Sequence, residues 1–209
     1  MVCGVCGGTG AGKTTLVRDL VDRWGSSQVS LLAFDSYYHD LSHLDPSDRV
    51  AVNYDHPDSL DVELFIEHLD SLRAGFAVDV PEYDFATHTR PGTANRVEPK
   101  PLVIADGILL LAFAEIRERL DHAVFLDVDS GIRFERRLRR DTVERGRSES
   151  SVRSQWVTTV DPMHEQYVAP YATHADVVVG RYDEACRIDV ADTVAEGLRR
   201  RTVTQSVNG

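Results

Sequence analysis

A glycine-rich segment near the N-terminus constrains this chain more than any other feature of its sequence. Residues 7–14 read Gly-Gly-Thr-Gly-Ala-Gly-Lys-Thr and match the pattern G-x-x-x-x-G-K-[ST]. The apolar run Val2–Cys6 precedes this segment, and Lys13–Trp24 has helical spacing. A strand, such a loop and a helix together place backbone N–H groups and the positive end of the helix around a phosphate. The sequence therefore predicts a site for the phosphates of a nucleoside triphosphate, formed by Gly7, Gly8, Thr9, Gly10, Ala11, Gly12, Lys13, Thr14 and Thr15.

The scarcity of lysine supports this interpretation over a chance glycine-rich turn. Only Lys13 and Lys100 occur, and arginine supplies every other basic side chain. A slim ammonium can reach the β- and γ-phosphates where the broad arginine fork would not serve. We therefore predict that Lys13 acts in catalysis and that the Thr14 hydroxyl ligates Mg²⁺.

Apolar runs and amphipathic segments alternate along the rest of the chain. This alternation predicts a three-layer α/β/α fold of the phosphate-loop type with a mainly parallel sheet. The remaining expected strands are Val29–Phe34, Leu102–Ala105, Ala123–Leu126 and Asp176–Val179, and the remaining expected helices are Asp61–Ala74, Ile132–Arg145, Val152–Tyr167 (broken or kinked around Pro162) and Arg187–Arg200. We expect one domain over residues 1–201, with an irregular β-hairpin insertion at 77–98, a helical lid at 133–160 and a disordered tail at 202–209.

Two aspartates stand where expected strands end. Asp106 follows Leu102–Ala105 and precedes Gly107, which is the arrangement of an acidic residue that holds Mg²⁺ beside a phosphate loop; the alternative is a turn-forming Asp-Gly pair. Asp35 follows the apolar run that ends at Phe34, at the sheet edge where open α/β folds place ligand chemistry. Asp35 could take a proton from a substrate hydroxyl, or it could cap a turn.

Seven arginines gather between residues 133 and 147. In a chain with a net charge of −11, this cluster marks a local positive field suited to closing over a triphosphate; the alternative is a solvated basic surface. Gly146 could serve as a hinge between two of these arginines. They are Arg133, Arg136, Arg137, Arg139, Arg140, Arg145 and Arg147.

The composition limits partners and location. The acidic balance argues against general binding to nucleic acids or anionic membranes, and no apolar run approaches the ~20 residues of a membrane span. Cys3 and Cys6 form a C-x-x-C pair that could be a redox or half-zinc motif. Their apolar context favours small buried side chains instead, since the third and last cysteine, Cys186, completes no second pair. With no signal peptide visible, we expect a cytoplasmic protein.

Read together, these features closely resemble the uridine–cytidine kinases of the phosphoribulokinase/uridine kinase family. The resemblance runs from Gly4 to about Val179. Besides the phosphate loop, it rests on segments 35–38 (Asp-Ser-Tyr-Tyr), 53–58 (Asn-Tyr-Asp-His-Pro-Asp), 83–85 (Tyr-Asp-Phe) with His88 and Arg90, 106–109 (Asp-Gly-Ile-Leu), 140–147 (Arg-Asp through Glu-Arg-Gly-Arg) and 162–163 (Pro-Met).

The resemblance implies ATP-dependent phosphorylation of uridine or cytidine at the 5′-hydroxyl, with ATP or GTP as donor and Mg²⁺ as cofactor. It implies that Asp35 is the general base and, with Thr14 and Asp106, contacts the metal. The acceptor contacts that it implies are Tyr38, Asp55 and Arg137 for the ribose, Tyr83, Phe85 and His88 for the base, and Ile108 and Gln155 on the same side. Arg140, Arg145 and Arg147 match the lid arginines that bind the donor. The resemblance further implies a homotetramer.

Three positions depart from the family pattern. Asp106 replaces a glutamate, Gly180-Arg181-Tyr182-Asp183 replaces Pro-Arg-Gly-Gly, and Ala172-Thr173-His174 lacks a lysine. Two alternatives stay open at this point. One is the same chemistry on another small hydroxyl compound, such as pantothenate, a sugar phosphate or nicotinamide riboside. The other is a relative that binds a nucleotide for regulation without catalysis.

Overall fold

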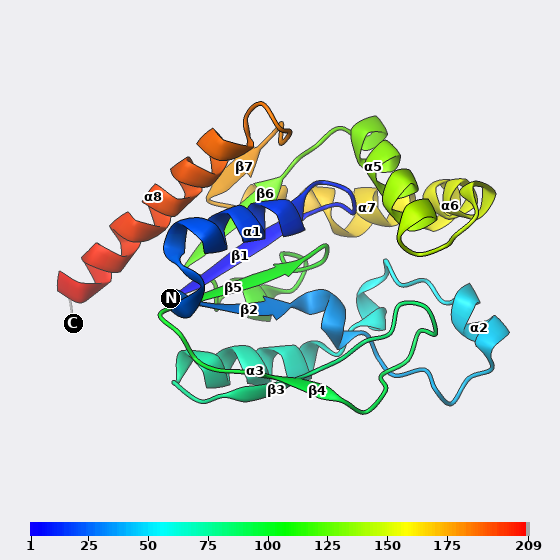
Figure 1. Cartoon of the computed structure of the whole chain (residues 1–209), viewed down its shortest axis with the longest axis horizontal. Helices are drawn as coiled ribbons and strands as arrows, with labels where there is room; N and C mark the ends of the chain where they lie inside the picture. The colour runs from blue at the N-terminus through cyan, green and yellow to red at the C-terminus, as the bar shows by residue number, and fades with distance from the viewer. Residues whose placement is uncertain (208–209) are drawn as a thin grey trace.

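Five parallel strands form the central sheet of this protein, in the order β2-β5-β1-β6-β7. The computed structural model describes residues 1–207, and for 202–207 it describes the backbone only. The strands are β1 (Val2–Gly7), β2 (Val29–Ala33), β5 (Leu102–Gly107), β6 (His122–Leu126) and β7 (Val177–Val179). Helices cover both faces of the sheet (Figure 1). The predicted three-layer α/β/α fold with a parallel sheet is confirmed.

Each face of the sheet has its own core. Helices α1 (Lys13–Trp24) and α8 (Arg187–Val207) pack against each other over one face. Helix α3 (Val62–Arg73) and the antiparallel hairpin of β3 (Val78–Pro81) and β4 (Ala94–Val97) lie on the other face. The hairpin is the irregular insertion predicted at 77–98. Because both faces are covered, the strands are continuous apolar runs rather than alternating ones.

Cys3 and Cys6 point to opposite faces of the sheet. Both thiols are buried, Cys3 in the core beneath α1 and α8 and Cys6 in the core beneath α3. Neighbouring positions of a strand alternate between faces, so residues three apart cannot share a disulfide or a metal. Burial raises the pKa of Cys3 to about 12. The interpretation of these cysteines as small buried side chains is confirmed.

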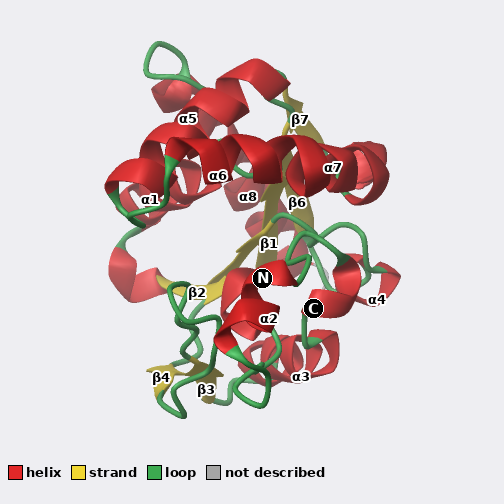
Figure 2. Cartoon of the chain, turned by 90° about the vertical axis from the view of Figure 1, so that its right-hand side faces the viewer, coloured by secondary structure: helices red, strands yellow, loops and turns green. Residues whose placement is uncertain are grey.

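The connections that follow the carboxyl ends of the strands build the rest of the molecule. Figure 2 shows α5, α6 and α7 on one side of this end and α2 with the β3–β4 hairpin on the other. The remaining helices are α2 (Pro46–Ala51), α4 (Ala114–Arg117), α5 (Ser130–Val143), α6 (Glu149–Gln155) and α7 (Asp161–Tyr167), and a π-helical turn, Trp156–Val160, joins α6 to α7. None of the described helices combines the length and apolar character needed to cross a membrane.

Several boundaries differ from the predicted ones. Strand β2 ends at Ala33, and Phe34 begins a 3₁₀ turn. Strand β5 continues through Asp106 to Gly107, so these residues do not form the alternative Asp-Gly turn. Gly107 is instead required by packing, since a Cβ there would lie 2.7 Å from the Phe34 Cβ.

The last helix also extends further than predicted. Helix α8 continues to Val207 instead of ending at Arg200. The expectation of a disordered tail over residues 202–209 is therefore wrong for residues 202–207. The predicted helix ended where the polar residues begin. The rest of that predicted tail, residues 208–209, lies outside the described residues.

Candidate active site

The phosphate loop leaves β1 at Gly7 and enters α1 at Lys13. Gly10 has φ +77°, and a Cβ at this position would lie 2.2 Å from the backbone carbonyl oxygen of Arg133. Gly12 is the N-cap residue of α1, with φ +104°, and the ring of Tyr182 packs directly against it. Both glycines are thus required by left-handed backbone and by close neighbours. The loop is held between the start of α1, α5 and the segment before α8.

Lys13 lies at the first turn of α1 and extends back over the loop. Its ammonium donates to the carbonyl oxygens of Gly7 and Gly8 at 2.9 and 3.2 Å. Burial lowers its pKa, and the charges of Asp35 and Asp106 oppose that shift. The ammonium therefore lies among the loop carbonyls with two carboxylates near it.

Asp106 lies on β5, and Asp35 directly follows the adjacent strand β2. Asp106 is on β5, paired in register with Ala33 of β2, and Asp35 lies in the 3₁₀ turn that follows β2. Burial, followed by the negative charge of Asp35, raises the pKa of Asp106 to about 6. Two close carboxylates and the Thr14 hydroxyl are hard oxygen donors, and Mg²⁺ in kinases is held by one or two carboxylates, substrate phosphates and water. The donor set fits Mg²⁺, although the described residues contain no group of three His, Cys, Asp or Glu that would hold a metal alone.

The tip of the β3–β4 hairpin forms an aromatic box. The Tyr83 ring centroid lies 5.2 Å from those of both Tyr38 and Phe85. His88 stacks on Tyr54 at 4.2 Å and has φ +57°, which costs a non-glycine residue about 1 kcal/mol. Burial is the main cause that lowers the pKa of His88, so its ring is neutral at pH 7. The hairpin therefore presents a cluster of mutually inclined aromatic rings with one neutral imidazole.

Two residues, Asp84 and Arg90, hold this hairpin in place. Asp84 closes the tip, because its carboxylate accepts from the Ala86 N–H at 2.8 Å and the Thr87 hydroxyl at 2.7 Å. Arg90 fixes the hairpin to the turn after β2, since it donates to the Tyr38 carbonyl oxygen at 2.9 Å and pairs with Asp61 at 3.3 Å. Arg90 is therefore an anchor of the hairpin.

Asp55 and Arg137 lie between this box and the phosphate loop. Burial raises the pKa of Asp55, and the charge of Arg137 opposes the shift. Arg137 is buried and donates to the Thr9 hydroxyl of the loop and to the Gln155 side-chain oxygen, both at 3.4 Å. A carboxylate and a guanidinium that line the same pocket can hold the two hydroxyl groups of a vicinal diol.

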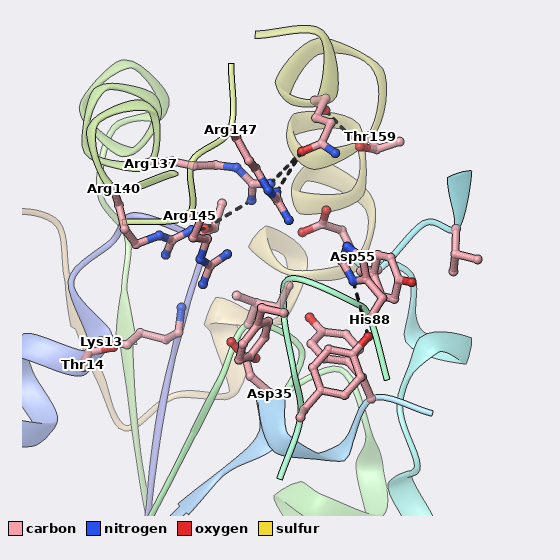
Figure 3. Close-up of a pocket in the computed structure, with 18 of the residues that line it drawn as sticks. Lys13, Thr14, Asp35, Asp55, His88, Arg137, Arg140, Arg145, Arg147 and Thr159 are labelled. Carbon is pink, nitrogen blue, oxygen red and sulfur yellow. Dashed lines mark hydrogen bonds between the residues drawn. The ribbon is translucent and has the colours of Figure 1, made fainter. Parts of the chain in front are cut away.

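The lid arginines converge on the same space. Figure 3 shows Arg137, Arg140, Arg145 and Arg147 directed from α5 and the following loop into the volume around Lys13 and Asp35. Arg147 donates to the Gln155 side-chain oxygen at 3.2 Å, and Arg145 lies 5.1 Å from the centroid of the Phe85 ring. The arginines of this cluster therefore have different surroundings, and not all of them reach the pocket. Arg133 is buried beneath the phosphate loop, and Arg139 is exposed to solvent.

One pocket collects most of the predicted site residues. It contains every predicted acceptor contact, both aspartates, the lid arginines and three loop residues: Thr9, Lys13, Thr14, Asp35, Tyr38, Asp55, Tyr83, Phe85, His88, Asp106, Ile108, Arg137, Arg140, Arg145, Arg147 and Gln155. A second cleft, on the other side of the loop, is lined by Gly12 and Thr15 together with Arg136, residues 182–185 and Arg187. Gly7, Gly8, Gly10 and Ala11 line neither of these two pockets.

Four further residues of the first pocket were not predicted: Val50, Val52, Tyr54 and Thr159. In the sequence, Tyr54 stands out only as part of the 53–58 segment, and its position among polar residues is the signal that could have indicated a site residue. It supports His88 by stacking and donates its hydroxyl to the Arg49 carbonyl oxygen at 2.8 Å. Val50 and Val52 flank the end of a short helix that the sequence pattern did not reveal.

Comparisons with known proteins point to one family of kinases. The family model described as "Phosphoribulokinase / Uridine kinase family" matches residues 2–186. Uridine kinase of Chloroflexus aurantiacus is 44% identical over 178 residues, which cover 85% of each chain, and that of Clostridium perfringens is 43% identical over 176 residues, 84% of this chain and 85% of the other. The structure of phosphoribulokinase from Rhodobacter spheroides superposes with a TM-score of 0.62 at 12% identity, over 90% of this chain and 73% of the other.

Proposed function

Since this chain belongs to the phosphoribulokinase/uridine kinase family of kinases, we propose that it transfers the γ-phosphoryl group of ATP to the 5′-hydroxyl of uridine or cytidine. One observation carries the proposal. A single pocket joins a phosphate loop and four lid arginines at one side to an aromatic box at the other, with Asp35 between them. The products would be ADP and either UMP or CMP.

The acceptor side favours a ribonucleoside over the other small hydroxyl compounds. Tyr83, Phe85 and His88 offer ring surface and a hydrogen-bonding edge for a planar base. Asp55 can accept from the 2′- and 3′-hydroxyls while Arg137 balances its charge. A deoxynucleoside would leave part of this half-buried carboxylate unpaired, which costs about 100-fold in kcat/KM.

The donor side would act mainly by position and charge. Lys13 and the arginines Arg140, Arg145 and Arg147 would neutralise the phosphates, and Asp35 would accept the proton of the attacking hydroxyl. Thr14, Asp35 and Asp106 would hold Mg²⁺, which supplies charge neutralisation between the phosphates when it is bound. The arginines also cover the loop, which excludes water from the transferring group.

We place the base of the donor in the second cleft. Arg136 donates to the Tyr182 carbonyl oxygen at 2.7 Å, and the Tyr182 hydroxyl donates to buried Asp19 at 3.0 Å. Tyr182 stands where the family commonly has glycine, so its ring narrows the approach to Gly12 and Thr15. The choice between ATP and GTP would be made at this cleft.

The experiment is a coupled assay with ATP and Mg²⁺ against a panel of acceptors. We expect turnover with uridine and cytidine, and kcat/KM lower by about 100-fold for their 2′-deoxy forms. Turnover only with pantothenate, a sugar phosphate or nicotinamide riboside would replace the acceptor that we propose. Binding of ATP without turnover on any acceptor would support the regulatory alternative.

A further inference from the structure

One buried carboxylate lies at the centre of the lid arginines. Asp141, near the end of α5, has no exposed surface. Arg140 approaches it at 2.8 Å, Arg147 at 3.4 Å and Arg137 at 3.5 Å, and Arg145 lies 3.7 Å away. Among residues 1–201, Asp141 is the one carboxylate that forms ion pairs within 4 Å with these four arginines.

Apart from Asp141, the side chains that accept hydrogen bonds from these arginines are neutral. Arg137 and Arg147 share the Gln155 oxygen, and Arg137 and Arg140 share the Thr9 hydroxyl at 3.4 and 3.5 Å. Four guanidinium groups thus share one directly paired carboxylate in a partly buried space. Asp141 is therefore the carboxylate that directly pairs these like charges, and Asp55 adds a second negative charge that acts on Arg137.

Asp141 also organises the backbone after α5. The Arg147 N–H donates to the Asp141 carbonyl oxygen at 3.0 Å, which folds the loop 144–148 back onto the helix. Gly146 has φ +63° inside that loop, so the chain reverses there. Side chain and backbone of one residue thus set the direction in which arginines from both the helix and the loop enter the pocket.

We propose that Asp141 is a positioning residue that holds the lid arginines in competition with the phosphates of the donor. This inference rests on the proposed function and deepens it. Asp141 shares the guanidinium N–H groups that the triphosphate needs, so it weakens phosphate binding while it fixes the geometry of transfer. Binding follows the net charge of the site, whereas transfer depends on donors aimed at the moving group.

Replacement of Asp141 by asparagine separates these two effects. The amide has the same shape but removes the competing charge, so the dissociation constant for inorganic tripolyphosphate should fall by about three- to tenfold. The arginines lose their common anchor, so kcat with ATP and uridine should fall by about 100-fold. If Asp141 only supported the fold of the lid, affinity would instead be lost together with the rate.

Glu149→Gln is the matched control. Glu149 lies at the start of α6 in the same lid and pairs with Arg153 at 2.7 Å, and both side chains are exposed. This variant removes the same charge by the same chemical change without contact with the pocket. Its tripolyphosphate affinity and its kcat should stay within about twofold of those of the unchanged protein.

The measurements use the full chain. Tripolyphosphate binding is followed by titration calorimetry, kcat by the coupled assay, and the fold by thermal unfolding. Weaker tripolyphosphate binding in Asp141→Asn, or an unchanged kcat, would overturn the inference. If this variant does not fold, Asp141→Asn with Arg145→Gln restores the net charge; a folded double variant with unchanged kcat would also refute the role of Asp141. If the unchanged protein phosphorylates no nucleoside, the proposed function fails, and the tripolyphosphate titration still decides on Asp141.

Discussion

Asp35 and Asp106 are chemically identical side chains with different surroundings. Asp106 belongs to β5, an interior strand of the sheet, and burial and the neighbouring charge raise its pKa to about 6. Asp35 lies on the turn after the edge strand β2 and faces both the phosphate loop and the acceptor box. The shorter side chain of Asp106, where the family has glutamate, keeps its carboxylate close to the sheet. This difference in place favours Asp35 for contact with the acceptor hydroxyl and Asp106 for the metal.

The role of Asp35 as base leads to a specific prediction. Asp35→Asn keeps the shape of the side chain but cannot take up the hydroxyl proton, so kcat with uridine should fall by about 1000-fold. The dissociation constant for ATP, measured by calorimetry, should change by less than about threefold. Asp58→Asn is the control, because the Asp58 side chain is 91% exposed and pairs only with His56 among the described residues. Unchanged turnover in Asp35→Asn would remove Asp35 from the mechanism.

Residue roles were predictable where a local motif carries them. Lys13, Asp35 and the acceptor contacts each belong to a short pattern, and the structure brings them to one pocket. Asp141 escaped the sequence analysis because its role depends on arginines from two segments. The available signal was spacing, since Arg137 and Arg145 stand four residues before and after it and helical neighbours at this spacing can pair. That signal was hidden among seven arginines.

At the scale of elements, the phosphate loop depends on what packs behind it. Gly10→Ala would place a Cβ 2.2 Å from the Arg133 carbonyl oxygen, so the loop must move. We expect the affinity for ATP, measured by calorimetry, to fall by about 100-fold or more. Gly75→Ala is the control, because Gly75 has φ +87° but no atom within 4 Å of its Cβ position. It should lower the free energy of unfolding by about 1 kcal/mol and leave ATP affinity unchanged. Equal ATP affinity in both variants would contradict this account of the loop.

The lid shows what an element prediction can and cannot reach. The sequence predicted a break around Pro162, because proline lacks the N–H that the helix needs. In the structure, the helix is interrupted before the proline, by a π-helical turn at Trp156–Val160 in which the Asp161 N–H donates to the Trp156 carbonyl oxygen. The position of this π-helical turn depends on Trp156, whose ring packs against Phe134 and the Arg133 guanidinium. Such contacts join residues from two helices, so a linear pattern does not contain them.

The whole molecule combines an acidic balance with a positive site. The net charge is −11, yet four arginines and Lys13 line one pocket. Composition alone argued against phosphate polymers as partners, and the fold concentrates positive charge in a space the size of a nucleotide. The homotetramer implied by the family resemblance stays a prediction, and sedimentation equilibrium would test it.

Buried and half-buried histidines predict that the whole fold is sensitive to acid. Burial lowers the pKa values of His68, His88, His122 and His164, the last to about 4. Below about pH 6.5 the unfolded chain therefore binds protons that the native state does not, so the free energy of unfolding falls as pH falls from 6.5 towards 4. His164 alone should account for about 3 kcal/mol of this loss, because its neutral ring lies against Gly8 and the Arg133 guanidinium.

Urea unfolding of the full chain at several pH values would measure this effect. His164→Gln removes the titrating group and keeps a polar side chain, so its free energy of unfolding should depend less steeply on pH between about pH 6.5 and about pH 4. Since carboxylates that titrate in the same range are unchanged in the variant, the difference between the two curves isolates His164. Parallel curves would show that His164 takes up its proton equally in the folded and unfolded chains, and that its burial against the phosphate loop does not make the native state acid-labile.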